Sequence, residues 1–161
     1  MKVFWSWQSD THGNTGRHFI KETLEIAIKE LKEEIEVDEP NRELHLDHDR
    51  KGVPGSPDLV NTILEKIRAT SIFIADVTPV GQTANGKPLI NSNVAIELGY
   101  ALANIGDQGL LMVLNSYYGN RDSLPFDLKQ KAGPIIFSLK PDASKAERTT
   151  IVIGTIQGCN S

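Results

Sequence analysis

The segment that most constrains the fold is the run at residues 71–77, which reads SIFIADV. Apolar and β-branched residues fill almost every position, whereas a strand with one solvent-exposed face would alternate apolar and polar residues. Such a run is typical of a central strand in a parallel sheet, because helices cover both of its faces. Parallel strands need crossover connections, which are usually helices. The chain is therefore predicted to be an α/β domain.

Shorter apolar runs predict four further strands, at residues 2–7, 43–49, 109–115 and 133–139. Apolar residues at helical spacing predict helices between them, over residues 20–35, 56–67 and 94–105. The second helix has the clearest start, with Ser56 as N-cap and Pro57 at its first position, and the third stops at Gly106. A last helix is predicted from about Ala143, although Gly154 interrupts its pattern. Residues 78–92 are predicted to form a long surface loop.

Five strands that alternate with helices predict a flavodoxin-like, three-layer domain with a parallel sheet in the order 2-1-3-4-5. In this topology ligands bind beyond the carboxyl ends of strands 1 and 3, where the winding of the sheet reverses. We therefore expect the functional residues in the loops that follow Trp7 and Val77.

Length and composition predict one cytoplasmic domain over residues 1–161. A chain of 161 residues suits a single core, and 39% hydrophobic with 24% charged residues is ordinary for a globular protein. No apolar run is long enough for a membrane helix and no signal peptide follows Met1, so neither a membrane nor export is expected. The lone Cys159 forms no internal disulfide, which fits a reducing compartment. The tail, residues 142–161, is expected to be less regular and truncated.

The charge distribution argues against nucleic acid as a partner. The formal net charge is −4, and lysines and arginines are scattered among acidic residues. A surface that binds nucleic acid gathers its basic residues on one face.

Polar side chains gather in the two loops at the predicted ligand-binding edge. They are Ser6, Gln8, Ser9 and Asp10 after the first strand, and Asp76, Thr78, Asn91, Asn93 and Glu97 after the third. On the predicted helix, Asn93, Glu97 and Tyr100 are spaced to share a face, about 100° from the apolar stripe. A carboxylate near a helix N-terminus can stay ionised and stabilise an oxocarbenium-like state of N-glycosidic cleavage. The same spacing also suits an ordinary surface glutamate.

Five segments together resemble bacterial TIR-like domains over residues 3–139. They read VFWSWQSD (3–10), SPDLVNTILEKI (56–67), IFIADVT (72–78), NSNVAIELGYAL (91–102) and LPFDL (124–128). The fourth is similar to the N-x-N-V-x-x-E-L-G-x-A motif of that group, and it also resembles nucleoside deoxyribosyltransferases. The resemblance implies a TIR-like fold and points to Glu97 as the catalytic glutamate of a TIR NADase.

The resemblance also implies roles for residues around that glutamate. Three are expected to border the nucleotide: Ser6, Gln8 and Asp10. Two are expected to shape the pocket: Asp76 and Asn93. The loop at residues 50–55 occupies the position of a TIR segment that governs assembly and access to the site, and its glycines fit a movable lid. The long loop at 78–92 and the tail depart from the family's pattern.

The leading hypothesis is an NAD⁺ glycohydrolase or ADP-ribosyl cyclase, in which nicotinamide leaves and Glu97 stabilises the ribosyl cation. NAD⁺ is then the substrate, and no cofactor is expected. The family resemblance implies self-association or a partner effector or sensor protein, in a setting of antiphage defence. Two alternatives stay open: a non-catalytic module that binds a nucleotide or another protein through the same crevice, and deoxyribosyl transfer between bases.

Two patterns that look like ligand sites have simpler explanations. Residues 81–87, GQTANGK, match the spacing of a phosphate-binding loop, but Pro88 supplies neither an amide donor nor a hydroxyl there, so a surface loop is predicted. Ligand-type side chains also cluster near the second strand: His45, Asp47, His48 and Asp49. They lack a third spaced histidine or a cysteine, so no metal site is predicted.

Aromatic and thiol side chains complete the set of candidates. Trp5 and Trp7 are predicted to be core residues on one face of the first strand. Tyr117 and Tyr118 follow the fourth strand, where adenine stacking is an open alternative. Cys159 is not expected to be a nucleophile, because no histidine lies near it in the sequence.

Overall fold

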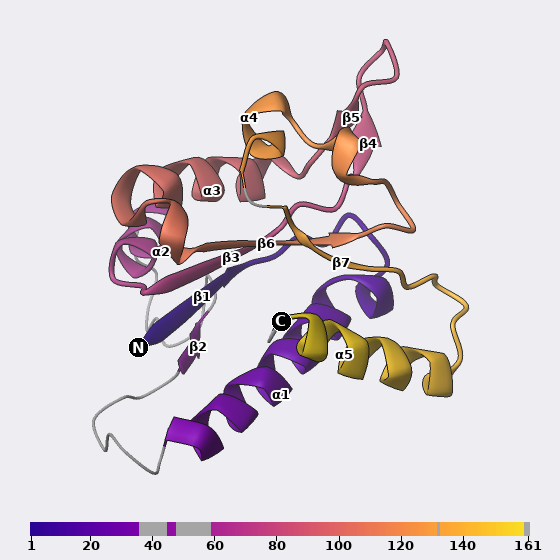
Figure 1. The fold of residues 1–161 in the computed structure, drawn as a ribbon. Helices are drawn as coiled ribbons and strands as arrows, with labels where there is room; N and C mark the ends of the chain where they lie inside the picture. Colours follow the sequence, from indigo (N-terminus) through magenta and orange to yellow (C-terminus); the bar gives the residue numbers. More distant parts are fainter. Residues whose placement is uncertain (36–44, 48–58, 132, 160–161) are drawn as a thin grey trace.

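The computed structural model describes residues 1–35, 45–47, 59–131 and 133–159. They form a five-stranded sheet in the order β2-β1-β3-β6-β7, in which every neighbouring pair is parallel (Figure 1). The strands are β1 (Lys2–Ser6), β2 (His45–Asp47), β3 (Ile72–Asp76), β6 (Leu110–Asn115) and β7 (Ile135–Phe137). Counted along the chain, this is the predicted order 2-1-3-4-5, so the winding reverses between β1 and β3.

Helices cover both faces of this sheet and make three layers (Figure 1). On one face lie α1 (Arg17–Ile35) and α5 (Lys145–Cys159), which contact each other. On the other face lie α2 (Leu59–Arg68), α3 (Ser92–Ile105) and α4 (Phe126–Lys129). Short 3₁₀ turns lie between the main elements, at η1 (Gly13–Thr15), η2 (Asp107–Gly109) and η3 (Arg121–Ser123).

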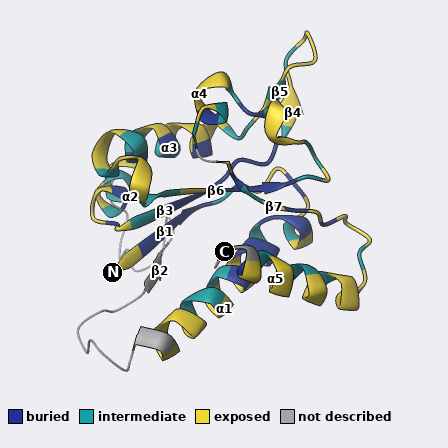
Figure 2. Ribbon diagram, viewed as in Figure 1, coloured by how far each residue is buried: buried dark blue, intermediate teal, exposed yellow. Residues whose placement is uncertain are grey.

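Each face of the sheet has its own apolar core, because side chains alternate along the central strands. Phe4 of β1 stacks on Phe73 of β3 on the α3 side, with 5.7 Å between their ring centroids. Trp5 points to the opposite face, where it packs in one core with Phe19 of α1. The strands β1, β3 and β6 form a largely buried middle layer, and the outer sides of the helices are exposed (Figure 2). Ser6 follows Trp5 and therefore returns to the α3 side.

Two elements differ in extent from the prediction. β7 covers residues 135–137 rather than 133–139, because it pairs only with β6, along Val113 to Asn115. The last helix, predicted from about Ala143, is α5, and it continues through the β-branched run and through Gly154, where the sequence pattern was interrupted. Val152 and Ile156 of this helix are buried in the core beside α1. Tertiary packing therefore outweighs the weak helix propensity of this segment.

The predicted loop at residues 78–92 contains a small hairpin that the sequence analysis did not anticipate. Its strands are β4 (Gly81–Gln82) and β5 (Pro88–Leu89), which pair antiparallel. Gly86 turns the chain with a φ of 77°, and its amide donates to the Thr83 carbonyl at 2.8 Å. The dipeptide Asn85-Gly86 is a strong sequence signal for a hairpin, and the hairpin could have been predicted from it. The hairpin projects away from the sheet (Figure 1).

Several expectations lie outside the described residues. These are the Ser56 cap with Pro57, the proposed lid at residues 50–55, and the ends of the predicted strand at 43–49, of which only the backbone at 45–47 is described. Among the helices that the structure describes, none combines the length and apolar character needed to cross a membrane.

Candidate functional site

A cavity of about 370 Å³ lies where the topology predicts a ligand site, beyond the carboxyl end of β1. Its walls come from the loop after β1, from α2 and from the first two turns of α3. The lining residues are Trp7, Gln8, Ser9, Leu59, Val60, Ile63, Leu64, Asn91, Asn93, Ile96 and Glu97. Predicted polar residues and an apolar wall therefore meet in one cavity.

The start of α3 is fixed by Asn91, whose side-chain oxygen accepts from the amides of Asn93 at 2.9 Å and Val94 at 3.1 Å. The buried stripe of the helix then faces the sheet through Val94 and Leu98. This orientation turns Asn93 and Glu97 toward the cavity. Tyr100, predicted on the same face, lies outside it and accepts from the Arg68 guanidinium at 2.6 Å.

A short hydrogen bond joins Glu97 to β1, an inner strand of the sheet. The hydroxyl of Ser6 donates to Oε2 of Glu97 at 2.5 Å. Ser6 is only 1% exposed, whereas Glu97 is partly exposed at the cavity. The structure thus brings together two of the predicted site residues, from β1 and from α3.

Gln8 lines the cavity, but its amide is occupied by hydrogen bonds within the protein. Its nitrogen donates to Thr11 Oγ1 at 2.8 Å and to Asp76 Oδ2 at 3.1 Å. Its oxygen accepts from the amides of Asp10 at 2.6 Å and Thr11 at 3.0 Å. These four bonds use the full capacity of a glutamine amide. Gln8 therefore fixes the loop after β1, and its wall of the cavity is rigid.

Asp76 lies behind this loop at the end of β3, does not line the cavity and is fully buried. Burial raises the pKa of its carboxyl, because the charged form loses water. Hydrogen bonds from the hydroxyl and amide of Thr78 and from Gln8 act in the other direction and lower the pKa, but the effect of burial is larger. The carboxyl of Asp76 therefore supports the loop that borders the cavity.

Asp10 lies beside the cavity rather than in its wall. Its Oδ2 accepts from the Asn91 side-chain amide at 2.7 Å. On its other side is a second cavity of about 270 Å³, lined by Asp10, Thr11, Pro79, Val80, Gly81, Gln82, Pro88 and Tyr118. The bond between Asp10 and Asn91 therefore lies between two cavities. The Tyr118 hydroxyl is engaged with Thr15 at 2.8 Å, and Tyr117 is 54% exposed.

The apolar wall of the larger cavity was only partly anticipated. Trp5 is a core residue, as predicted, but Trp7 lies just after β1 and lines the cavity as well as packing on the core. Val60 is one of the apolar residues at helical spacing from which the helix over 56–67 was predicted, and it is 65% exposed at this wall. Ile96 is 67% exposed at the same wall. Its place on α3 outside the buried stripe was the available signal for a ligand surface.

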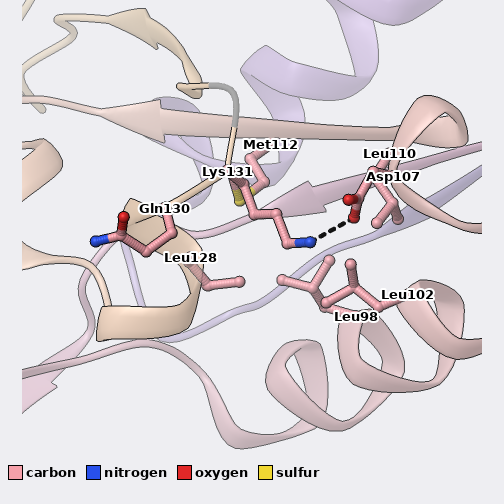
Figure 3. Close-up of a pocket in the computed structure, with 8 residues that line it drawn as sticks. All are labelled: Leu98, Leu102, Asp107, Leu110, Met112, Leu128, Gln130 and Lys131. Carbon is pink, nitrogen blue, oxygen red and sulfur yellow. Dashed lines mark hydrogen bonds and ion pairs between the residues drawn. The ribbon is translucent and has the colours of Figure 1, made fainter.

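A third cavity, of about 260 Å³, differs in chemistry (Figure 3). Leucines and Met112 form most of its wall, between α3, β6 and α4. Lys131 reaches across its mouth to Asp107, with 2.5 Å between ammonium and carboxylate. This cavity lies apart from the polar residues at the ends of β1 and β3.

The remaining candidates contribute no site among the described residues. The segment at 81–87 is followed by Pro88 in strand β5 and not by a helix, so it lacks the loop-to-helix arrangement of a phosphate-binding loop. Within the described ranges, no three His, Cys, Asp or Glu side chains cluster as metal ligands. His48 and Asp49 lie outside those ranges, and the side chains of His45, Asp47 and Cys159 are not described.

Comparisons with known proteins give likenesses among solved structures and no sequence match. No family model matches the sequence, and no curated protein matches it. Among solved structures, the chain is similar to a 2-desoxiribosyltransferase from Leishmania mexicana, with a TM-score of 0.49 and 19% sequence identity over 94% of this chain and 97% of that chain.

Proposed function

We propose that this chain is a TIR-like enzyme that cleaves an N-glycosidic bond of a nucleotide in the cavity at the end of β1, with Glu97 as its catalytic residue. Within that class we propose NAD⁺ as the substrate and nicotinamide as the leaving group. The observation that carries the proposal is the position of the Glu97 carboxylate, which lines the cavity at the reversal point of the sheet.

Cleavage of this bond requires little from the protein beyond a negative charge beside the ribose. When the bond between ribose C1′ and the nicotinamide nitrogen breaks, its electron pair moves to the pyridinium ring, which leaves as neutral nicotinamide. The ribose becomes oxocarbenium-like, and a carboxylate beside it stabilises the positive charge. Water or an acceptor group of the substrate then attacks C1′; when water attacks, one proton is released.

The composition of the cavity supports a positively charged leaving group. Among the described residues that line it, Glu97 is the one carboxylate. A neutral purine or pyrimidine needs a proton donor before it leaves, whereas a pyridinium does not. The exposed apolar side chains of Val60 and Ile96 offer a surface for a planar base.

The test is release of nicotinamide from NAD⁺, measured by chromatography at several protein concentrations. We expect turnover by the wild type and a loss of about 10³-fold in kcat/KM for Glu97→Gln, because the substitution removes the charge and keeps the shape. Asp107→Asn is the matched control, since this carboxylate lies at the mouth of the separate leucine-lined cavity. Equal turnover by wild type and Glu97→Gln would remove Glu97 from the mechanism.

The same preparation separates the proposal from its alternatives. Binding of NAD⁺ or ADP-ribose in a thermal shift assay, without any product, would instead support a non-catalytic module. Exchange of adenine into deoxyribonucleosides, in place of nicotinamide release, would support deoxyribosyl transfer at the same glutamate.

A further inference from the structure

We infer that Ser6 is a positioning residue for Glu97: its buried hydroxyl holds the carboxylate in the orientation that the cleavage step uses. This inference rests on the proposed function, because it assigns Ser6 a role that passes through Glu97. It also differs from the expectation that Ser6 borders the nucleotide, since the side chain acts on the glutamate rather than on the ligand.

The first support is the contact itself. The distance of 2.5 Å from Ser6 Oγ to Glu97 Oε2 lies at the short end of the range for a hydroxyl bound to a carboxylate. An ionised glutamate only accepts hydrogen bonds, so the hydroxyl of Ser6 is the donor. Ser6 is 1% exposed, so bulk water hardly competes for this proton.

The second support is the rigidity of the strand that carries Ser6. β1 lies between β2 and β3 in the sheet, and Ser6 is in register with Ala75 of β3. The next wall residue, Gln8, is fixed by four hydrogen bonds to the loop and to Asp76. The donor therefore sits on a strand that is paired on both sides, whereas a glutamate side chain on a helix has several rotamers.

The third support is where Ser6 lies relative to the cavity. Glu97 lines the cavity and Ser6 does not, so the hydroxyl stands behind the carboxylate. A group in this position can orient the carboxylate toward a bound ribose without touching the ligand. Misplacement of a catalytic group by about 1 Å can cost about 10²-fold in rate, which is the scale of effect at stake.

The test is a kinetic double-mutant cycle between positions 6 and 97. We expect Ser6→Ala to lower kcat by about 10- to 100-fold, with a much smaller change in KM. Ser6→Thr keeps the hydroxyl and should restore most of kcat. In the Glu97→Gln background, Ser6→Ala should change the residual rate by less than about twofold, because a residue that acts only through Glu97 has nothing left to position. Ser116→Ala is the matched control, because its hydroxyl binds the Phe137 carbonyl instead.

Three results would overturn the inference. If the effects of Ser6→Ala and Glu97→Gln multiply, or if Ser6→Ala acts mainly on KM, Ser6 contacts the substrate independently. If Ser6→Ala matches the wild type, the hydroxyl has no role in the reaction.

A wild type without any glycosidic activity would refute the proposed function. The contact between Ser6 and Glu97 is then tested by protein stability alone. Urea unfolding of the wild type, Ser6→Ala, Glu97→Ala and the double variant should show that the two substitutions are non-additive, because each removes one side of the same hydrogen bond. Additive effects on the free energy of unfolding would overturn the role of Ser6 as well.

Discussion

The carboxyl group of Asp76 lies fully buried at the end of β3, a position where a charged group loses all contact with water. Its partners are the amide of Thr78 at 3.1 Å and the side-chain nitrogen of Gln8 at 3.1 Å. Burial raises the pKa more than these donors lower it, so the net direction is upward from the ordinary value of 3.8. One buried acid thus couples the loop beside the cavity to the solution pH.

A series of unfolding experiments with Asp76→Asn tests this coupling. Because the folded pKa is raised, Asp76 contributes stability that is complete below the unfolded pKa near 3.8 and is lost as the pH rises through the folded value. The free energy of unfolding of the wild type, relative to the variant, should therefore fall as the pH rises through that window. The variant should also be less stable than the wild type by about 1–3 kcal/mol at every pH. The reason is that the amide in place of the carboxyl puts a second hydrogen-bond donor against the donor of Gln8. A difference that stays constant with pH would contradict the raised pKa.

At the scale of residues, the sequence supports Glu97 as the candidate but not the roles of its neighbours. Glu97 could be singled out because its motif and its helix are both local features of the chain. The full engagement of Gln8 depends on Asp76, which is 68 positions away in the sequence. Tyr100 was expected beside Glu97, yet it pairs with Arg68 of α2 instead. Contacts between segments that are distant in the sequence determine these roles. Such contacts cannot be predicted from the periodicity of apolar residues.

Among the elements, the hairpin of β4 and β5 depends on a single glycine. Gly86 has a φ of 77°, a region that L side chains enter only with strain, whereas the φ of Gly81 in the same hairpin is not positive. An added Cβ at Gly81 would have open space around it. The two glycines therefore provide a matched pair.

Amide hydrogen exchange of the hairpin tests the role of Gly86. Gly86→Ala should speed exchange at the amides of Val80 and Thr83, which bond to Leu89 and Lys87, by about tenfold. Gly81→Ala should leave these rates nearly unchanged. Similar rates in both variants would show that the turn does not depend on the left-handed conformation.

The elements also show where local patterns are sufficient. The apolar run at 71–77 and the stripes of α2 and α3 follow from local periodicity, and those elements were found where they were predicted. The edge strand β7 and the last helix α5 were predicted, but their extents were not. Their extents depend on pairing with β6 alone and on packing against α1, and neither is visible in a local pattern.

At the scale of the whole molecule, topology determines where the candidate site lies. Reversal of the winding between β1 and β3 leaves space at their carboxyl ends, and the loop after β1, α2 and α3 enclose it. The sequence could predict this location because the strand order follows from alternating elements. The apolar wall with Val60 and Ile96 could not be predicted, since it depends on how α2 packs against α3.

The most direct test of the central claim is a crystal structure of the Glu97→Gln variant with NAD⁺, because this variant should bind the substrate without consuming it. We expect the nicotinamide ribose in the cavity between the end of β1, α2 and α3, with its C1′ within about 3.5 Å of the side chain at position 97. NAD⁺ bound in the cavity beside Tyr118 or in the one closed by Lys131, with position 97 away from the ribose, would contradict it.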